Sequence, residues 1–413
     1  MTDTSPFTRL TVGPLTLRNR FIKSATNEGM ARGGVPSAML VKWHEGFAKG
    51  GVGLTTVAYC AVSPDGRTFV DQVTMDRRSL PDLKALTDAV HRHGCAASAQ
   101  ITHGGCFTFL PELTTGRPFS SSGGFNKVGV MSGRFFRKEM TEADMEQVAG
   151  EFAAAARLAR AAGFDAVEIH MGHGYLLSQF ISPLYNKRRD RYGGSVANRV
   201  RYPARVLQRV LDSVGKDMAV ICKFSIADGV KGGNTSDDGA AIARILETEG
   251  AHLLVLSAGM NVESITTMFG SSFPKENRVT PANPVIAAGM FIQRLTEPKN
   301  VVFRELYLLE HARKIRGAVK MPLAYLGGVE SLANAETAMV EGFDAVALGR
   351  ALIFDPALVD HFRNHVSSRS GCTRCNLCTA MMYTAGGTSC VLHAPNDVAL
   401  NNTPGRVLSE QIV

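Results

Sequence analysis

The feature that most restricts the fold of this chain is a regular alternation of short apolar segments with longer segments of helical period. Several of the short segments lack the polar alternation of a half-exposed strand, as expected for parallel strands buried on both faces. The eight short segments are Phe21–Thr26, Val52–Ala58, Ala96–Ile101, Asp165–His170, Ala219–Phe224, His252–Ser257, Pro322–Gly327 and Asp344–Gly349. The helical segments are Leu80–His93, Thr141–Ala162, Ser236–Glu249, Val302–Arg316, Ser331–Glu341 and Pro356–Val366.

This alternation within 413 residues predicts an α/β fold, a closed (β/α)8 TIM barrel. The competing architecture is a doubly wound open sheet, which would carry a glycine-rich dinucleotide turn after an early strand. No G-x-G-x-x-G string occurs in the chain, so the barrel is favoured. Hydrophobic residues make up 45% and charged residues 20% of the chain. That balance excludes intrinsic disorder, and no apolar run is long enough to span a membrane.

The connections between the segments indicate where a site and a domain boundary lie. Two connections are long, Thr102–Met140 and Ala258–Val301, the second with Pro281, Pro284 and Pro298 in it. Both should leave from the C-terminal rim of the barrel, where barrel enzymes build their sites. After Val366 the pattern changes to a Ser/Gly/Cys-rich tail. We therefore expect a barrel over residues 1–366 and a cysteine-containing C-terminal extension, 367–413, packed on it.

The charge pattern bears on partners and compartment. The formal net charge is +8, but its one dense basic run, Lys187–Arg191, has no aromatic interleaving. A mildly basic chain of this kind usually presents a solvated surface, so no nucleic-acid partner is expected. The N-terminal residues MTDTSPFTRL lack the regions of a signal peptide, and a cytoplasmic location without membrane attachment is expected.

Polar residues and glycines follow nearly every expected strand, and in a barrel these positions converge at one rim. The glycines after the last two strands suit a phosphate group, because free backbone N–H groups point at the anion there. The residues alone therefore predict an enzyme that holds a phosphorylated ligand. The rim residues are Ser24, Asn27, Tyr59, Gln100, His103, His170, His173, Tyr175, Lys223, Ser257, Gly327, Gly328, Gly349 and Arg350.

Five segments carry a resemblance to a known family. The longest is VEIHMGHGYLLSQFISPLYNKRRDRYGGSVANR, Val167–Arg199; the others are Leu17–Gly29, Gly50–Arg67, His93–Gly105 and Asp344–Leu358. Taken in chain order, they resemble the old yellow enzyme family of NADH:flavin oxidoreductases, which are FMN-bound (β/α)8 barrels. The resemblance implies FMN as cofactor and NAD(P)H as reductant.

The resemblance also implies the catalytic residues. His170 and His173 match the pair that hydrogen-bonds the carbonyl oxygen of an unsaturated substrate, and Tyr175 matches the phenol that protonates its α-carbon. The chemistry is consistent, because hydride addition to an enone drives negative charge onto the carbonyl oxygen, where two fixed donors stabilise it. A tyrosine can complete the addition as general acid.

Cofactor contacts follow from the same resemblance. The residues implied to bind the flavin are Ser24, Ala25, Asn27, Tyr59, Gln100 and Lys223, and those in the phosphate region are Ser257, Gly259, Gly327, Gly328, Gly349 and Arg350. Two positions depart from the family pattern: Lys223 stands where many relatives carry Arg, and Asn27 stands where they often carry Thr or Cys. Lys keeps the charge near flavin N1 and O2 but loses the planar fork of Arg.

The tail holds four clustered cysteines, Cys372, Cys375, Cys378 and Cys390. Four thiolates suit a [4Fe–4S] cluster or tetrahedral zinc, and spacing alone does not identify the metal. Free thiols are the third alternative. The string CTRCNLC resembles the cluster-binding segment of trimethylamine dehydrogenase and, more loosely, that of 2,4-dienoyl-CoA reductase.

The leading hypothesis is an FMN-dependent NAD(P)H oxidoreductase that reduces activated C=C bonds of enone-type small molecules. The first alternative is an FMN/iron–sulfur dehydrogenase of amine or dienoyl type, which passes electrons through a tail cluster to a partner protein. Tyr59 and the tail cysteines favour it. Two weaker alternatives are a tRNA-modifying flavoenzyme that uses Cys106 and an FMN-binding scaffold without turnover. The sequence leaves open the nicotinamide preference and whether the chain forms a homo-oligomer.

Overall fold

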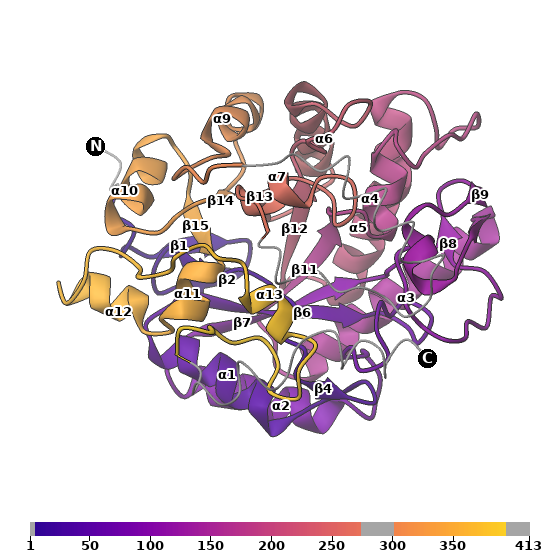
Figure 1. The fold of residues 1–413 in the computed structure, drawn as a ribbon. Helices are drawn as coiled ribbons and strands as arrows, with labels where there is room; N and C mark the ends of the chain where they lie inside the picture. The colour runs from indigo at the N-terminus through magenta and orange to yellow at the C-terminus, as the bar shows by residue number, and fades with distance from the viewer. Residues whose placement is uncertain (1–4, 274–300, 394–413) are drawn as a thin grey trace.

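The computed structural model describes residues 5–273 and 301–393. Eight parallel strands close into a barrel in the order β11-β12-β13-β14-β15-β3-β6-β7, with helices around it (Figure 1). The predicted (β/α)8 barrel is confirmed. The strands are β3 Phe21–Lys23, β6 Leu54–Ala61, β7 Ala96–Thr102, β11 Ala166–Met171, β12 Ala219–Ser225, β13 Leu253–Ser257, β14 Leu323–Leu326 and β15 Ala345–Leu348.

The remaining elements surround or extend this barrel. The longer helices are α1 Ala38–Lys49, α2 Leu80–His91, α3 Glu142–Ala161, α5 Val196–Val214, α6 Ser236–Thr248, α9 Leu309–Ala318 and α10 Leu332–Val340. The shorter helices are α4 Leu176–Ile181, α7 Ile265–Phe269, α11 Arg350–Phe354, α12 Leu358–Arg363 and α13 Cys378–Met381, with a 3₁₀ turn at Val128–Ser132. The strands outside the barrel are β1 Leu10–Val12, β2 Leu15–Leu17, β4 Ala31–Arg32, β5 Val35–Pro36, β8 Phe119–Ser120, β9 Gly124–Phe125 and β10 Phe136–Glu139.

Side-chain caps fix where two of the predicted helices begin. Thr141 and Asp144 form a capping box at the start of α3, in which each side chain accepts from the other residue's backbone N–H. Thr235 and Asp238 do the same for α6. The cap of α6 is therefore Thr235, one residue before the predicted start at Ser236.

Other helix boundaries differ from the prediction. The helix expected from Val302 begins only at Leu309. Before it, Leu306 has a φ of +51° and donates its N–H to the Gly328 carbonyl, so the chain is held against β14 and is not helical there. Helices α1 and α5 were not predicted, and α5 carries Pro203 in its interior.

The two ends of the barrel are filled differently. Hairpin residues Leu10, Val12 and Leu17 are buried in one apolar cluster with barrel residues such as Ala166 and Leu253, which lie at or near the beginnings of their strands. The β1–β2 hairpin therefore closes the N-terminal end of the barrel. The C-terminal end is left for polar groups.

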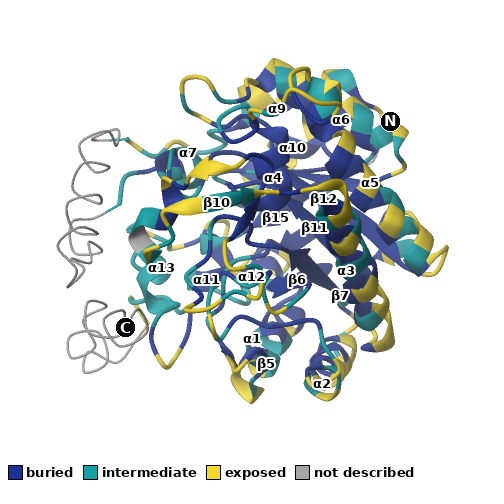
Figure 2. Cartoon of the chain, turned by 90° about the vertical axis from the view of Figure 1, so that its right-hand side faces the viewer, coloured by how far each residue is buried: buried dark blue, intermediate teal, exposed yellow. Residues whose placement is uncertain are grey.

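The cysteine-containing tail packs on the C-terminal side. It first runs beside the start of α10, where Ser370 N–H donates to the Glu330 carbonyl and Leu332 N–H donates to the Ser368 carbonyl. It then forms α13, which lies in front of the barrel in Figure 1 and to one side of it in Figure 2. The division into domains 1–366 and 367–413 stays a prediction. Pro281, Pro284, Pro298 and the last part of the tail lie outside the described residues.

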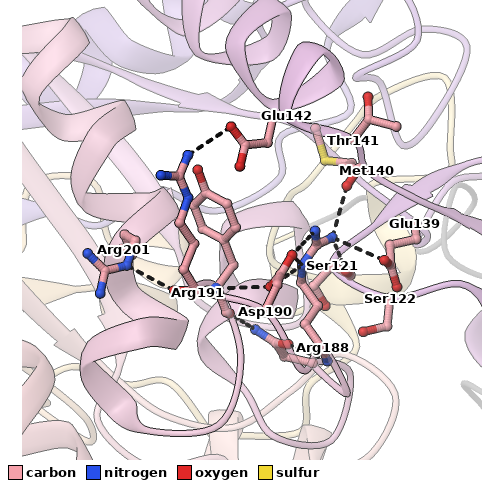
Figure 3. Close-up of polar contacts among 12 residues, drawn as sticks. Ser121, Ser122, Glu139, Met140, Thr141, Glu142, Arg188, Asp190, Arg191 and Arg201 are labelled. Atoms are coloured by element: carbon pink, nitrogen blue, oxygen red, sulfur yellow. Dashed lines mark hydrogen bonds and ion pairs between the residues drawn. The ribbon is translucent and has the colours of Figure 1, made fainter.

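The basic run after α4 is tied to the loop sheet of β8, β9 and β10 (Figure 3). Arg188 donates to the carbonyls of Ser121 at 3.0 Å and Met140 at 2.9 Å, and it pairs with Asp190. Arg191 pairs with Glu142 at 2.8 Å. These arginines hold the loop in place and have acidic partners; the expected absence of a nucleic-acid partner stays a prediction.

Within the described residues, no helix has the length and apolarity that a membrane crossing requires.

Most of the barrel surface that faces the helices is buried, as the dark blue strands in Figure 2 show. The eight residues of β6, the seven of β12 and the five of β13 are all buried. This explains why these strands lack alternation in the sequence. Polar side chains on them must therefore find partners inside the protein.

Candidate active site

Strand register brings the predicted residues together at the C-terminal rim. His170 of β11 lies opposite Lys223 of β12, and Ser225 of β12 lies opposite Ser257 of β13. On the other side, Glu168 of β11 pairs with Gln100 of β7. The predicted convergence of polar residues from separate strands is therefore observed along four consecutive strands, β7, β11, β12 and β13.

The two histidines are hydrogen-bonded in series. His170 Nδ1 accepts from the Gly172 N–H at 3.2 Å, which leaves the proton of a neutral ring on Nε2. His170 Nε2 lies 3.3 Å from His173 Nδ1, and His173 Nε2 lies 2.7 Å from Ser257 Oγ. The network thus assigns a proton to Nε2 of both rings, with His170 donating to His173 Nδ1 and His173 donating to Ser257 Oγ. A substrate oxygen gains the His170 donor by replacing the 3.3 Å contact, the longest of the three.

The backbone of His173 is held in an uncommon conformation. Its φ is +61°, in the left-handed region that non-glycine residues rarely adopt. Its N–H donates to Ser225 Oγ at 3.1 Å, and its carbonyl accepts from the Asn261 N–H at 3.1 Å. Groups from β12 and from the loop after β13 therefore fix the position of this ring, as is common for strained residues at functional sites.

Both imidazoles are neutral at ordinary pH. Burial lowers the pKa of His173 to about 3, with a smaller contribution from Lys223. Burial also lowers the pKa of His170 well below its ordinary value, with contributions from His173 and Lys223. Neutral rings in a low-dielectric environment act here as hydrogen-bond donors and not as general acids.

Tyr175 is the first residue before α4 and turns its ring toward the histidines. The ring centroid lies 4.8 Å from that of His170 and 5.2 Å from that of Tyr59. Burial raises the pKa of the Tyr175 phenol, and the nearby polar groups of Tyr59 and Asn261 oppose this rise. Tyr59, predicted as a cofactor contact, therefore lies beside the predicted proton donor, and Asn261 was missed by sequence reasoning.

A buried lysine occupies the side of the rim next to the histidines. Lys223 Nζ donates to Ser24 Oγ at 3.0 Å and to the Ala25 carbonyl at 3.2 Å. Gln100 Nε2 donates to Glu168 Oε1 at 2.6 Å. Burial lowers the pKa of Lys223, and Glu168 opposes that change. The predicted group of Ser24, Ala25, Gln100 and Lys223 thus forms one buried network, to which the unpredicted Glu168 belongs.

A second buried ion pair was missed by sequence reasoning. Lys23 Nζ contacts Glu28 Oε1 at 2.5 Å, and both side chains are 1% exposed. Glu28 Oε2 accepts from the Ala58 N–H at 3.1 Å, and His44 Nε2 lies 3.6 Å from Oε1. Burial raises the pKa of Glu28, but Lys23 and His44 outweigh it and hold that pKa below its ordinary value. This pair ties the loop after β3 to β6, next to Tyr59.

The predicted phosphate region contains glycines whose neighbours explain their identity. A Cβ at Gly327 would lie 2.9 Å from Leu308, and one at Gly328 would lie 2.9 Å from the Leu306 nitrogen. A Cβ at Gly259 would lie 2.7 Å from the backbone nitrogen of Met268. These three glycines allow close backbone packing, and their contact with phosphate stays a prediction.

The Arg350 guanidinium is turned toward the tail. It donates to Asn376 Oδ1 at 2.5 Å, to Ser271 Oγ at 3.2 Å and to the Phe269 carbonyl at 2.7 Å. The same guanidinium lies over the rings of Phe269 and Phe303. Arg350, the first residue of α11, therefore connects the end of β15 to α7 and to the tail. Its predicted phosphate contact stays untested.

The rim residues fit a flavin mononucleotide in their chemistry. Lys223 uses two of its three protons in the described contacts, which leaves one for a flavin oxygen. Thr26 Oγ1 is buried and makes no hydrogen bond within the described part of the chain. A Cβ at Gly349 would have only Thr26 Cγ2 within 4 Å, at 3.8 Å. Buried polar groups without partners normally contact a ligand or water.

Asn27 faces the tail through its backbone. Its carbonyl accepts from Thr388 Oγ1 at 2.6 Å, and its side-chain Oδ1 accepts from the Gly29 N–H at 3.2 Å. The predicted contact of Asn27 with the flavin stays a prediction. The tail contact was not predicted.

The four tail cysteines line one pocket, together with Arg350 and Asn376; they are Cys372, Cys375, Cys378 and Cys390. Burial raises the pKa of the Cys378 thiol to about 12, and the other three thiols add to that rise. Within the described residues, however, no three His, Cys, Asp or Glu side chains converge as metal ligands. The clustering is as predicted, and the metal stays untested.

Comparison with known families decides the class of protein. A model described as the NADH:flavin oxidoreductase / NADH oxidase family matches residues 6–368. The chain belongs to this family. It is therefore an oxidoreductase of the FMN- and NAD(P)H-dependent type, as the resemblance implied.

Two curated relatives show how far the similarity extends. The 4,4'-dithiodibutanoate disulfide reductase of Rhodococcus erythropolis is 42% identical over 395 residues, which cover 92% of this chain and 93% of that protein. The NADH oxidase of Thermoanaerobacter brockii is 33% identical over 352 residues, covering 84% of this chain and 48% of that protein. The chain thus matches one relative over nearly its full length and the other over about half.

A solved structure supports the fold. The old yellow enzyme homologue from Zymomonas mobilis has a TM-score of 0.68 and 23% identity, over 89% of this chain and 94% of that chain. At this identity the comparison shows the fold alone.

Proposed function

We propose that the chain uses NAD(P)H, through FMN, to reduce the activated C=C bond of a small enone-type carbonyl compound at the rim described above. The observation that carries the proposal is a buried group of two neutral histidines and a tyrosine. The His170 ring centroid lies 5.0 Å from that of His173 and 4.8 Å from that of Tyr175. Two donors and one acid within such a space match what enone reduction requires. When bound, FMN supplies the hydride.

The histidines would hold the substrate carbonyl. Negative charge develops on that oxygen as the β-carbon gains hydride, and His170 Nε2–H and the ring of His173 are held near it by Gly172 and Ser257. Donors that are already oriented stabilise the charge without reorganisation. Because both pKa values are lowered, the rings donate hydrogen bonds without giving up a proton.

Tyr175 would supply the proton to the α-carbon. Its hydroxyl then carries developing phenolate charge, which the nearby Tyr59 and Asn261 side chains stabilise, since both lower its pKa. Tyr59 is itself buried, with its pKa raised mainly by burial, so it remains protonated and able to donate. The two phenols therefore work as donor and supporting donor.

Lys223 would neutralise negative charge on the reduced cofactor. It is fixed by Ser24 and Ala25, which follow β3, and by charge attraction to Glu168 on β11. A fixed cation beside the flavin favours its anionic reduced form, which makes reduction by nicotinamide easier.

The test separates the two half-reactions. Anaerobic NADH or NADPH should bleach the bound flavin, and an enone such as cyclohexenone should restore its colour with loss of the C=C bond. Cyclohexanone, which lacks that bond, is the matched control and should not restore the flavin colour. Bleaching by nicotinamide without reoxidation by any enone would refute the substrate class while leaving the cofactor in place.

A disulfide is the second candidate substrate. It is favoured by the relative named as a disulfide reductase, which is 42% identical to this chain. Two-electron reduction of a disulfide yields two thiols and consumes two protons, of which Tyr175 could supply one. Reoxidation of the bleached flavin by 4,4'-dithiodibutanoate but not by cyclohexenone would favour this candidate over the enone.

We also infer that the four tail thiols hold a metal centre, either an iron–sulfur cluster or zinc. The support is their common pocket, since thiolates suit both. If the centre is an iron–sulfur cluster, an electron-transfer protein would be a further partner, as in the dehydrogenase alternative; zinc has no redox chemistry and would imply none. Iron, zinc and sulfide analysis of anaerobically purified protein tests this, and the absence of all three would refute it.

A further inference from the structure

The segment between the third and fourth tail cysteines lies against the loop that follows β3. Thr388 N–H donates to the Glu28 carbonyl at 2.7 Å, and Thr388 Oγ1 donates to the Asn27 carbonyl. A Cβ at Gly29 would lie only 2.0 Å from the Met382 carbonyl oxygen. The fit is therefore close at both ends of the segment, and Gly29 is required for it.

This segment brings Tyr383 to the end of a row of aromatic rings. Neighbouring centroids in the row are 5.2 to 5.8 Å apart. In order, the rings are Tyr383, Phe69, Phe109, Phe107, Tyr175 and Tyr59. The row thus joins the proposed proton donor to the tail through three phenylalanines. We call it the aromatic row.

The aromatic row bounds the space around the site. Tyr59 and Tyr175 are buried at 6% exposure, whereas Phe69, Phe107, Phe109 and Tyr383 keep part of their surface accessible. Phe69 also packs on the cluster of Ala25, Ala58, Tyr59 and Tyr175. Tyr383 lies near enough to both other tyrosines for electrostatic coupling: Tyr175 raises the pKa of Tyr383, and Tyr383 raises the pKa of Tyr59. Partly exposed rings beside a catalytic residue are suited to contact a flat apolar ligand.

We propose that Tyr383 is a specificity-determining residue, which contacts the flat body of the substrate and is positioned by a loop whose ends are Cys378 and Cys390. The inference rests on the proposed function and names its substrate class as conjugated carbonyl compounds with an aromatic or other planar group. Because Tyr383 and Thr388 both lie between these cysteines, a substitution that frees either thiol from the four-cysteine pocket should shift the position of the ring. The four-cysteine pocket thereby affects substrate selection.

The test compares two enones of different size in the holoenzyme. Methyl vinyl ketone reaches the histidines without a planar group, whereas chalcone carries two aryl rings. In Tyr383→Ala, KM for chalcone should rise by about tenfold, the upper range of one aromatic contact, while KM for methyl vinyl ketone and both kcat values stay within about twofold. Tyr383→Phe should restore the ratio of KM values. Phe125→Ala, which removes an exposed ring on β9, is the matched control.

Binding gives a readout that does not depend on turnover. The dissociation constant of chalcone, taken from the change it causes in the bound flavin's absorbance, should shift in parallel with KM. If wild type binds chalcone but reduces no enone, the proposed function fails and the inference on Tyr383 is still tested. An unchanged chalcone affinity in Tyr383→Ala would overturn the inference.

The role of the cysteines is tested by Cys390→Ser. This variant should weaken chalcone binding as Tyr383→Ala does, and the double variant should be no weaker than either alone, because both act through one ring. Cys95→Ala, at the other end of the barrel before β7, is the matched control and should leave the affinity unchanged. Additive effects of the two tail substitutions would refute the link between the thiols and Tyr383.

Discussion

Two walls of the candidate site are built in different ways. The first consists of strand ends, with His170 and Lys223 on β11 and β12, and each of these two side chains makes two hydrogen bonds to groups at the same rim. The second consists of aromatic rings from loops and from the tail, with Tyr383 at its end. The first wall is fixed by hydrogen bonds and charge, and the second by ring packing.

The difference indicates a division of tasks. Strand ends are set by the barrel itself, so groups that must be oriented to a fraction of an ångström belong there. Loops and tails tolerate change without disturbing the barrel, so contacts that select the substrate belong to them. Substitutions in the first wall should therefore reduce the rate, and those in the second should change substrate preference.

The largest effect should come from removing both histidines. His170→Ala with His173→Ala should lower enone reduction by about 10³-fold, because the developing oxyanion loses its donors. Bleaching by NADPH and the flavin content should change by less than about twofold. Stopped-flow measurement of the two half-reactions checks this, and equal losses in both would place the histidines in cofactor binding.

Breaking the buried ion pair tests whether the first wall also supports the fold. Glu28→Gln leaves Lys23 buried without a counter-charge and should lower the free energy of unfolding by about 3 to 5 kcal/mol. Chemical denaturation measures it. Glu45→Gln, which changes a partly exposed carboxylate on α1, is the control and should cost less than about 1 kcal/mol. If Glu28→Gln lowers the free energy of unfolding by as little as Glu45→Gln does, Lys23 has found another partner for its charge.

Tyr175→Phe keeps the ring in the aromatic row and removes only the hydroxyl. Reoxidation of the flavin by an enone should slow by about 10²-fold, the lower range for loss of a general acid. Reduction by NADPH should be unaffected. If reoxidation is unchanged, another group or water supplies the proton.

The smallest effect concerns stability at acid pH. The pKa of His173 is about 3 in the folded chain, against roughly 6.5 when unfolded. Between these values the unfolded chain holds one more proton, so acid favours unfolding. From about pH 7.5 to about pH 5.5, His173 should cost about 1.4 kcal/mol of stability. His173→Gln should show a correspondingly weaker pH dependence, and an identical slope would contradict the burial of that ring.

The fold was predictable because most barrel strands are short apolar segments, and because helices such as α3 and α6 begin at a side-chain cap and are followed by a glycine. Segment Asp165–His170 was expected where β11, Ala166–Met171, is found. The start of α9 was not predictable, because Leu306 is held by a distant carbonyl, that of Gly328. No local pattern in the sequence reveals such a contact.

The site was predictable only where residues follow strands directly. Glu168 lies two residues before His170 on β11, so its charge in a buried strand was an available signal. Lys23 in β3 gave the same signal. Glu28, Asn261 and Tyr383 gave none, because they lie in loops whose positions depend on packing between distant parts of the chain.

One measurement tests most directly whether the strand ends meet around a flavin. Purified protein should contain about one FMN per chain, and Lys223→Met should still bind it but with a lower reduction potential, because the cation that favours the reduced form is gone. Wild type and variant with equal flavin potentials would contradict the arrangement of Lys223, Ser24 and Gln100 around the cofactor.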